Sequence, residues 1–170
     1  MVKLTARLQD HKTARLKDYK TQSMKIRKAI PEDATVIIDF QKKMAWETER
    51  LKLASEKVDN GVKRVFSESG KGEYWVADDN GKVIASLLIT YEWSDWRNAD
   101  VWWFQSVYVL PEYRRKGIFR QMYSTIKKEA EKQGVAGLRL YVETTNINAQ
   151  KTYEALGMHC QHYRMYEWLK

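Results

Sequence analysis

Apolar residues follow two alternating spacings along residues 24–170, one typical of helices and one typical of strands. Spacings of three and four residues indicate helices, because such positions share one helix face. The first predicted helix begins at Pro31-Glu32-Asp33, a proline and two acids that favour a first turn. Its apolar stripe comprises Val36, Ile37, Phe40 and Met44. Three more helices are predicted at about residues 55–67, 117–133 and 148–156.

Strands are predicted where short apolar runs lie between turn residues. The run from Val83 to Tyr91 is almost continuously apolar, which is typical of a strand covered on both faces. The polar segment Asp78-Asp79-Asn80-Gly81 precedes it and predicts a hairpin turn. The predicted strands are residues 25–29, 74–77, 82–93, 99–110, 138–142 and 159–168. The whole pattern predicts an α/β (α+β) domain, with a central mixed β-sheet and helices on both faces.

Composition narrows the class of protein. The 170 residues suit a single domain. The only cysteine, Cys160, excludes an internal disulfide bond and favours a reducing compartment. No apolar run approaches the ~20 residues of a membrane span, and residues 1–20 lack the apolar stretch of a signal peptide. We therefore expect a cytoplasmic protein that does not associate with membranes.

The formal net charge of +8 is unevenly distributed. Residues 1–23 contain six lysines and arginines and two aspartates, so six minus two leaves +4 there and +4 for residues 24–170. We interpret residues 1–23 as a basic N-terminal extension and residues 24–170 as the domain. The extension is expected to be a poorly ordered passenger segment. The alternative, a basic arm that binds nucleic acid, is disfavoured and predicts steeply salt-dependent binding.

The most informative motif follows the strand that contains Val109. A short basic turn leads to a glycine that begins an amphipathic helix, and the chain reads Arg114-Arg115-Lys116-Gly117-Ile118-Phe119. The first turn of a helix has unpaired N–H groups and a positive dipole end, which favour phosphate binding. Gly117 permits a positive φ or a close backbone approach. The motif is neither a P-loop nor a dinucleotide fingerprint. By itself it indicates either an anion site or an ordinary basic turn.

A second motif lies in the helix predicted before Gly157. Asn146, Ala149 and Tyr153 stand three and four residues apart, and Met158 follows the glycine. Ala149 and Tyr153 share one helix face, so Tyr153 is expected to point towards the sheet. By itself this position is more typical of a core tyrosine with a satisfied hydroxyl group.

Together the two motifs resemble the signatures of the GNAT superfamily of N-acetyltransferases. The first signature is Arg/Gln-x-x-Gly-x-Gly/Ala, in which Phe119 replaces the small last residue, and the second is Asn-x-x-Ala-x-x-x-Tyr-x-x-x-Gly-Phe, in which Met158 replaces phenylalanine. The resemblance implies the GNAT fold over residues 24–170, with acetyl-coenzyme A (acetyl-CoA) as cosubstrate. It also implies a coenzyme site that contains Val107, Tyr108, Val109, Arg114, Arg115, Lys116, Gly117, Ile118, Phe119, Asn146, Ala149 and Tyr153.

The resemblance also implies how these residues act. The amides of residues 115–119 would bind the coenzyme pyrophosphate, and backbone groups of Val107 and Val109 would hold the pantetheine arm like an added strand. Asn146 is expected near the pantetheine, and Tyr153 near the coenzyme sulfur. Phe119 implies a slightly opened turn or a phenyl ring packed beside the cofactor.

The implied reaction is the direct transfer of an acetyl group from a thioester to a primary amine of a small molecule or a protein. Tyr153, with a reference pKa of ~10, would give a proton or a hydrogen bond to the leaving thiolate. Backbone N–H groups of residues 107–109 would stabilise the oxyanion. The first candidate for the base that deprotonates the amine is Glu92, and the second is Glu49. Both also fit ordinary surface carboxylates, and a water relay is the third possibility.

The remaining clusters carry weaker signals. His159, Cys160 and His162 suggest metal ligands, but strand parity separates the first from the other two, so no metal site is predicted. The four tryptophans near the second hairpin are interpreted as sheet core in preference to an aromatic cage for an amine; they are Trp93, Trp96, Trp102 and Trp103. The alternative function is a non-catalytic sensor that binds acyl-CoA. A homodimer would be common for the family.

Overall fold

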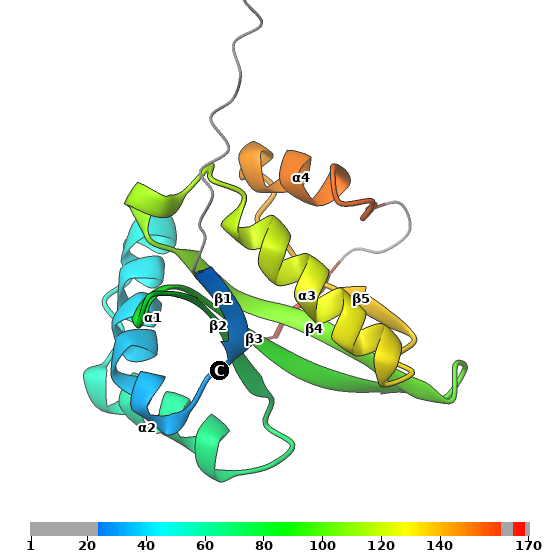
Figure 1. Cartoon of the computed structure of the whole chain (residues 1–170), viewed down its shortest axis with the longest axis horizontal. Coiled ribbons are helices and arrows are strands. Elements are labelled where there is room, and N and C mark those ends of the chain that lie inside the picture. The colour runs from blue at the N-terminus through cyan, green and yellow to red at the C-terminus, as the bar shows by residue number, and fades with distance from the viewer. Residues whose placement is uncertain (1–23, 161–164, 169–170) are drawn as a thin grey trace, which may run out of the picture.

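The computed structural model describes residues 24–160 and 165–168 (Figure 1). The elements in chain order are β1 (Met24–Lys28), η1 (Pro31–Asp33), α1 (Ala34–Glu49), α2 (Ser55–Ser67), β2 (Glu73–Asp79), β3 (Lys82–Ser94), β4 (Ala99–Val109), η2 (Pro111–Tyr113), α3 (Ile118–Lys132), β5 (Gly137–Arg139) and α4 (Ile147–Glu154). The predicted extension, residues 1–23, lies outside the described residues. Among the helices of the described residues, none has both the length and the apolar character needed to cross a membrane.

The strands form one five-stranded mixed sheet in the order β1-β2-β3-β4-β5. The first four strands are antiparallel neighbours. β5 pairs in parallel with β4, in a short register that begins at Val101 opposite Gly137 and ends at Trp103 opposite Arg139. The mixed sheet predicted from the sequence is therefore confirmed.

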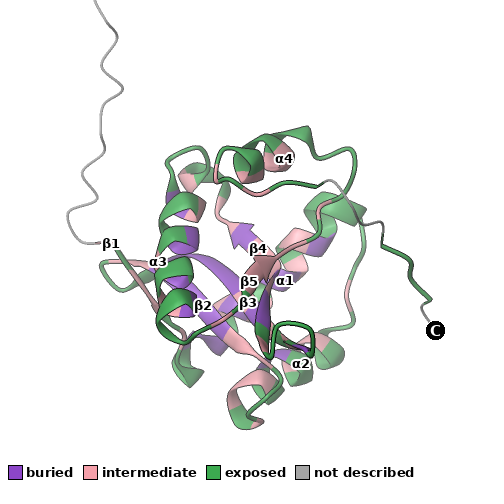
Figure 2. Ribbon diagram, turned by 90° about the vertical axis from the view of Figure 1, so that its right-hand side faces the viewer, coloured by how far each residue is buried: buried purple, intermediate pink, exposed green. Residues whose placement is uncertain are grey.

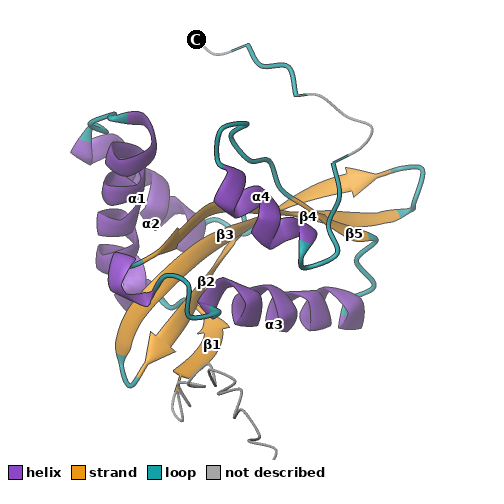
Figure 3. Cartoon of the chain, turned by 90° about the horizontal axis from the view of Figure 1, so that it is seen from above, coloured by secondary structure: helices purple, strands orange, loops and turns teal. Residues whose placement is uncertain are grey.

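Helices cover both faces of the sheet, as predicted (Figures 1 and 3). Successive residues of a strand point to opposite faces, so Val76 packs with α1 and α2 whereas Trp75 packs with α3. The core on the first face is formed around Ile37 and Phe40 of α1. The core on the second face is formed around α3, and residues just after α4 pack against it. Figure 2 shows the buried positions on the strands and on the helix sides that face them.

Most element boundaries agree with the sequence pattern. α2 begins and ends where its apolar spacing predicted, and Asn80 and Gly81 have φ values of 53° and 86° in the hairpin turn between β2 and β3. The strand predicted at residues 159–168 is not formed by its described residues, 159–160 and 165–168. Tyr166 and Trp168 are exposed there, so their aromatic surface is not packed against the sheet.

A β-bulge interrupts β4 near its end. Ser86 and Leu88 of β3 stand two positions apart, whereas their partners Tyr108 and Gln105 stand three apart, so β4 carries one extra residue. Ser106 lies in the bulge with a φ of 50°. The extra residue reverses the alternation of side chains: Phe104 faces α3, but Tyr108 faces α1.

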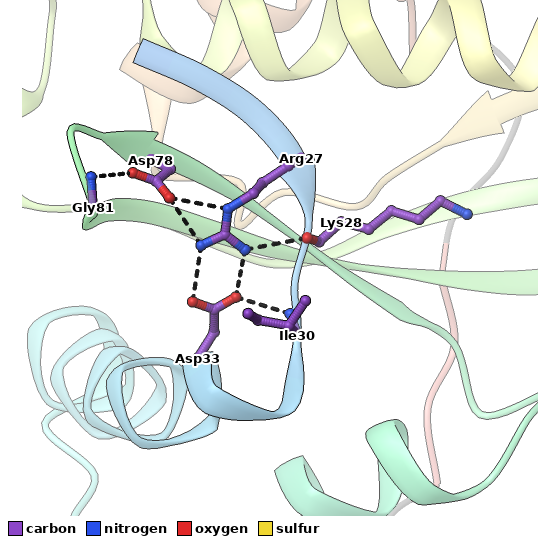
Figure 4. A network of polar contacts seen from close by, with 6 residues as sticks. All are labelled: Arg27, Lys28, Ile30, Asp33, Asp78 and Gly81. Carbon is purple, nitrogen blue, oxygen red and sulfur yellow. Dashed lines mark hydrogen bonds and ion pairs between the residues drawn. The ribbon is translucent and has the colours of Figure 1, made fainter. Parts of the chain in front are cut away.

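A partly buried ion-pair network joins β1 and the start of α1 to the first hairpin (Figure 4). The Arg27 guanidinium donates to both carboxylate oxygens of Asp33, at 2.6 and 3.0 Å, and its Nε donates to Asp78 Oδ2 at 3.0 Å. Asp33 also accepts from the Ile30 N–H at 2.9 Å. Burial would raise the pKa of the Asp33 carboxyl group, but these hydrogen bonds outweigh it and hold that pKa below its ordinary value.

Candidate active site

The candidate site begins where β4 and β5 separate. The register between them ends at Trp103 opposite Arg139, while β4 continues to Val109. Along residues 104–109, β4 therefore has β3 on one side and no strand on the other among the described residues. The bulge at Ser106 lies within this stretch, and bulges increase the local twist of a strand. An unpaired strand edge offers N–H and C=O groups to an extended, amide-containing ligand.

The basic turn follows this open edge and ends at the first residue of α3. Arg115 and Gly117 both have left-handed conformations, with φ values of 60° and 77°. Gly117 is the N-cap of α3, and among the described residues no side chain caps that helix end. The first hydrogen bond of the helix runs from the Gln121 N–H to the Gly117 carbonyl, so the amides of residues 118–120 have no partner one turn earlier. Such a group of convergent N–H groups is suited to an anion.

α3 is held rigidly behind this turn by its apolar stripe. Ile118, Met122 and Ile126 are buried against the sheet, as the spacing of apolar residues predicted. Because Ile118 is the first residue of the helix, the helix end is anchored at the position where its amides are exposed. The predicted phosphate turn therefore has a fixed geometry.

The three basic residues of the turn have different surroundings. Arg114 Nε donates to the Val109 carbonyl at 2.8 Å, and its Nη2 donates to Glu47 Oε2 of α1 at 2.5 Å. The Lys116 ammonium lies 5.2 Å from the centre of the Tyr113 ring. Arg115 is exposed. Arg114 is thus engaged by the protein itself.

Phe119, the residue that departs from the family signature, connects the two motifs. Its ring lies 5.5 Å from the Tyr153 ring in an edge-to-face arrangement and 6.2 Å from the Phe104 ring. Phe119 is half-buried and packs against the α3 face of the sheet. The large side chain therefore lies beside Tyr153, and Gly117 still begins the helix with its amides exposed.

α4 carries the second motif. Asn146 is its N-cap, and its side-chain oxygen accepts a hydrogen bond from the Ala149 N–H at 3.1 Å. Tyr153, on the same helix face as Ala149, is half-buried, and burial raises the pKa of its hydroxyl group. At neutral pH this hydroxyl group is therefore a proton donor. Met158, which follows the motif glycine, packs against the sheet core.

The two carboxylates predicted as bases, Glu92 and Glu49, have different surroundings. Glu92 is opposite Val101, and it accepts hydrogen bonds from Arg139 Nη1 at 2.7 Å and from Trp103 Nε1 at 2.5 Å. Six residues of strand, about 20 Å at ~3.3 Å per residue, separate Val101 from Val107. Glu49 is the last residue of α1 and is exposed. None of the hydrogen bonds found among the described residues joins Glu92 or Glu49 to Tyr153 or to the basic turn.

Glu47 belongs to the site but was not identified from the sequence. It contacts Tyr108 and Arg114, which lie 61 and 67 residues further along the chain. No local pattern distinguishes it from the neighbouring carboxylate Glu49. Only the fold, with α1 packed over the bulged end of β4, brings it to the basic turn.

The structure tests part of the expectations for the tryptophans and for the suggested metal ligands. Trp102 is buried in the sheet core, as interpreted, whereas Trp93 and Trp96 are 62% and 91% exposed, so the expectation of a shared core position is wrong for these two. Of the three suggested metal ligands, His162 lies outside the described residues. Within the described residues, no group of three or more histidines, cysteines or acids converges as a metal site would require.

Several known proteins are similar to this chain. The model of the acetyltransferase (GNAT) family matches residues 37–158. The crystal structure of a possible acetyltransferase from Clostridium difficile 630 is 44% identical, covers 87% of this chain and 98% of its own, and has a TM-score of 0.81. Glucosamine-6-phosphate N-acetyltransferase from Arabidopsis thaliana has the same fold, with a TM-score of 0.68 at 18% identity over 87% of this chain and 99% of its own.

A curated relative is also similar over a shorter stretch. Thialysine N-epsilon-acetyltransferase of Bos taurus is 32% identical over 75 residues, which are 44% of this chain and 44% of the relative. The chain thus matches less than half of that relative's length.

Proposed function

Because the chain belongs to the GNAT family of acetyltransferases, we propose that it transfers the acetyl group of acetyl-CoA directly to a primary amine of a small molecule or a protein. One observation carries the proposal. The unpaired edge of β4, residues 104–109, leads into the uncapped N-terminus of α3 at Gly117. This combination suits a ligand that has an amide-containing arm and a pyrophosphate.

The basic turn, the open edge of β4 and α4 would contact the pyrophosphate, the pantetheine arm and the thioester of acetyl-CoA. The amides of residues 115–119 would bind the pyrophosphate, and the left-handed Arg115 and Gly117 support this role. Tyr108 and the backbone of Val107 and Val109 would hold the pantetheine arm. The remaining proposed contacts come from Arg114, Lys116, Ile118, Phe119, Asn146, Ala149 and Tyr153.

Acetyl-CoA supplies an activated thioester, and the protein would supply proton transfer and electrostatic stabilisation. Tyr153 Oη would donate a proton or a hydrogen bond to the leaving sulfur, and its raised pKa keeps that proton available. Backbone N–H groups of residues 107–109 would donate to the oxyanion.

For the proton of the amine, we propose a water chain. Glu92 is engaged by Arg139 and Trp103, and Glu49 lies at the exposed end of α1. Replacing either carboxylate with glutamine is therefore expected to leave the maximal rate within about tenfold, below the usual contribution of a positioned general base. A larger loss in one variant would identify that carboxylate as the base.

The acceptor is proposed from chemistry common to the relatives. Thialysine and glucosamine 6-phosphate, which appear in the names of two similar proteins, each have a primary alkylamine. A panel of amino acids with side-chain amines, amino sugars and polyamines is therefore the first choice of acceptors. We also propose that the protein works in the cytoplasm, which the single Cys160 supports, and a homodimer stays a prediction.

The decisive experiment is calorimetric titration of acetyl-CoA into the whole chain, into a Gly117→Asp variant and into a Gly134→Asp control. Gly117 and Gly134 have φ values of 77° and 72° at opposite ends of α3, and a Cβ at either position meets no atom within 4 Å. The strain is therefore matched, but only Gly117→Asp adds a carboxylate to the proposed phosphate site. We expect it to weaken binding on the order of 100-fold, because like charges brought together cost several kcal/mol.

Measurement of turnover then distinguishes an acetyltransferase from a non-catalytic acyl-CoA sensor. Release of coenzyme A with any amine of the panel supports the transferase. Binding that Gly117→Asp abolishes, without turnover on any amine, favours the non-catalytic acyl-CoA sensor. Absence of binding to the folded parent chain would contradict both functions.

A further inference from the structure

Glu47 is the centre of a contact network that joins α1 to the candidate coenzyme site. Tyr108 Oη donates to Glu47 Oε1 at 2.8 Å, and Arg114 Nη2 donates to Glu47 Oε2 at 2.5 Å. The Arg114 guanidinium also lies 5.4 Å from the centre of the Tyr108 ring. Through its Nε, Arg114 donates to the carbonyl of Val109, the last residue of β4. Each oxygen of one carboxylate is therefore bound by a different part of the site.

Glu47 is ionised and Tyr108 is protonated at neutral pH. Burial would raise the pKa of the Glu47 carboxyl group, but the hydrogen bonds from Arg114 and Tyr108 outweigh it and lower that pKa. Burial and the bond to Glu47 raise the pKa of Tyr108 to about 12. Glu47 is therefore an acceptor at both oxygens, and Tyr108 remains a donor.

The network lies at the point where β4 becomes the basic turn. Because of the bulge at Ser106, Tyr108 faces α1, where it reaches Glu47. Arg114 comes from the other end of the short connection η2 and returns to the carbonyl of Val109. The two hydrogen bonds of Arg114 thus fix the separation between the strand end and the turn that leads to Gly117.

We propose that Glu47 is a positioning residue for coenzyme binding, which acts through Arg114 to set the turn between β4 and α3. This inference rests on the proposed function. In this arrangement Arg114 shapes the turn, and the exposed Arg115 supplies charge near the phosphates. A turn held in its binding geometry loses less conformational freedom when the ligand binds.

The exposure of the Glu47–Arg114 ion pair indicates that it contributes little to the stability of the fold. The side chains of Glu47 and Arg114 are 35% and 43% exposed. Ion pairs with this exposure contribute little to folding. Removal of the Glu47 charge should therefore change coenzyme affinity much more than it changes thermal stability.

The test compares Glu47→Gln with a matched control, Glu68→Gln. Glu68 is bound by Arg64 Nε at 2.5 Å and is 42% exposed, so it has a similar ion pair on α2, outside the site. We expect Glu47→Gln to raise the acetyl-CoA dissociation constant about tenfold, the loss of one charge-assisted hydrogen bond. The kcat at saturating acetyl-CoA should stay within about twofold, because the reacting groups are unchanged. Glu68→Gln should change neither quantity by more than about twofold.

A double-mutant cycle tests the route through Arg114. If Glu47 acts through Arg114, the double variant Glu47→Gln/Arg114→Gln binds acetyl-CoA no more weakly than Arg114→Gln alone. Fully additive losses, or an unchanged dissociation constant in Glu47→Gln, would overturn the inference. A melting temperature that falls far more in Glu47→Gln than in Glu68→Gln would also overturn it and assign Glu47 a structural role. Failure of the parent chain to bind acetyl-CoA would instead refute the proposed function.

Discussion

Tyr153, the proposed acid, has surroundings that suit a proton donor. It reaches the site from α4, and its ring contacts the Phe119 ring of α3. Phe119 occupies the position where the family signature has a small residue, so a side chain of the first motif orients the tyrosine of the second. The same packing removes water from the hydroxyl group and raises its pKa. A departure from the signature thus packs against the tyrosine that we propose as the acid.

Replacement of Tyr153 with phenylalanine is expected to lower kcat about 100-fold, the usual effect of losing a positioned general acid. The dissociation constant of acetyl-CoA should stay within about twofold, because the ring is retained. Steady-state kinetics and calorimetry measure the two quantities. Because the folded pKa lies above the ordinary value of 10.0, the protonated form persists throughout the neutral range, and Tyr153 adds no falling limb to the rate profile below pH 9.

The control is Tyr123→Phe. Tyr123 lies in the same aromatic cluster, 6.4 Å from the Phe119 ring, and belongs to the buried core. Loss of its hydroxyl group should leave kcat within about twofold. Equal losses in the two variants would mean that the cluster needs its hydroxyl groups for packing, which would contradict an acid role for Tyr153.

Among the elements, β4 has some features that the sequence predicted and others that it did not. Its first residue, Ala99, was predicted from the sequence, and its last residue, Val109, lies one residue before the predicted end. The bulge at Ser106 had no local signal, since Ser106 is not glycine and the extra residue is defined only by pairing with β3. The contact of Tyr108 with Glu47 depends on the bulge, because the extra residue turns Tyr108 towards α1. The sequence therefore predicted the basic turn, and the family resemblance implied an open strand edge at Val107 and Val109, but the bulge and Glu47 were not predicted.

Substitutions at Ser106 test the bulge directly. Serine with a φ of 50° is in the left-handed region, which costs L-residues about 1–2 kcal/mol. We expect Ser106→Gly to preserve or slightly raise the free energy of unfolding, because glycine has no such cost. Ser106→Val should lower it by about 1–2 kcal/mol, since β-branched residues avoid positive φ. Urea denaturation measures both.

The Ser106 variants also test whether the bulge in β4 affects coenzyme binding. If valine removes the bulge, the side chain of Tyr108 turns towards α3 and its contact with Glu47 is lost. Ser106→Val should then weaken acetyl-CoA binding, whereas Ser106→Gly should not. A valine variant as stable as the parent chain would show that residue 106 is not left-handed in solution.

Across the whole molecule, the sheet separates two cores, and polar contacts fix the first residues of the domain to it. α1 packs on one face and α3 on the other, so the end of β4 lies between them. α1 also carries Glu47, and the start of α1 is positioned by Asp33, its N-cap. The network of Arg27, Asp33 and Asp78 thus determines where α1 begins relative to β1 and to the first hairpin (Figure 4).

Asp33→Asn tests whether this network stabilises the fold, and its pH dependence identifies the charge responsible. The Asp33 side chain is 9% exposed and that of Arg27 is 31% exposed, so loss of the carboxylate should lower the free energy of unfolding by about 2 kcal/mol at pH 7. The folded pKa of Asp33 lies below the ordinary value of 3.8, so the stabilisation by its carboxylate is complete above that value and is lost as pH falls through the lower folded pKa. Urea denaturation should therefore give a constant difference between parent and variant from pH 7 to about pH 5, which narrows below about pH 4.

Asp39→Asn, which removes an exposed ion pair with Lys43 on α1, should cost less than about 0.5 kcal/mol. A difference for Asp33→Asn that stays constant to pH 3 would mean that packing, and not the carboxylate charge, fixes the start of α1.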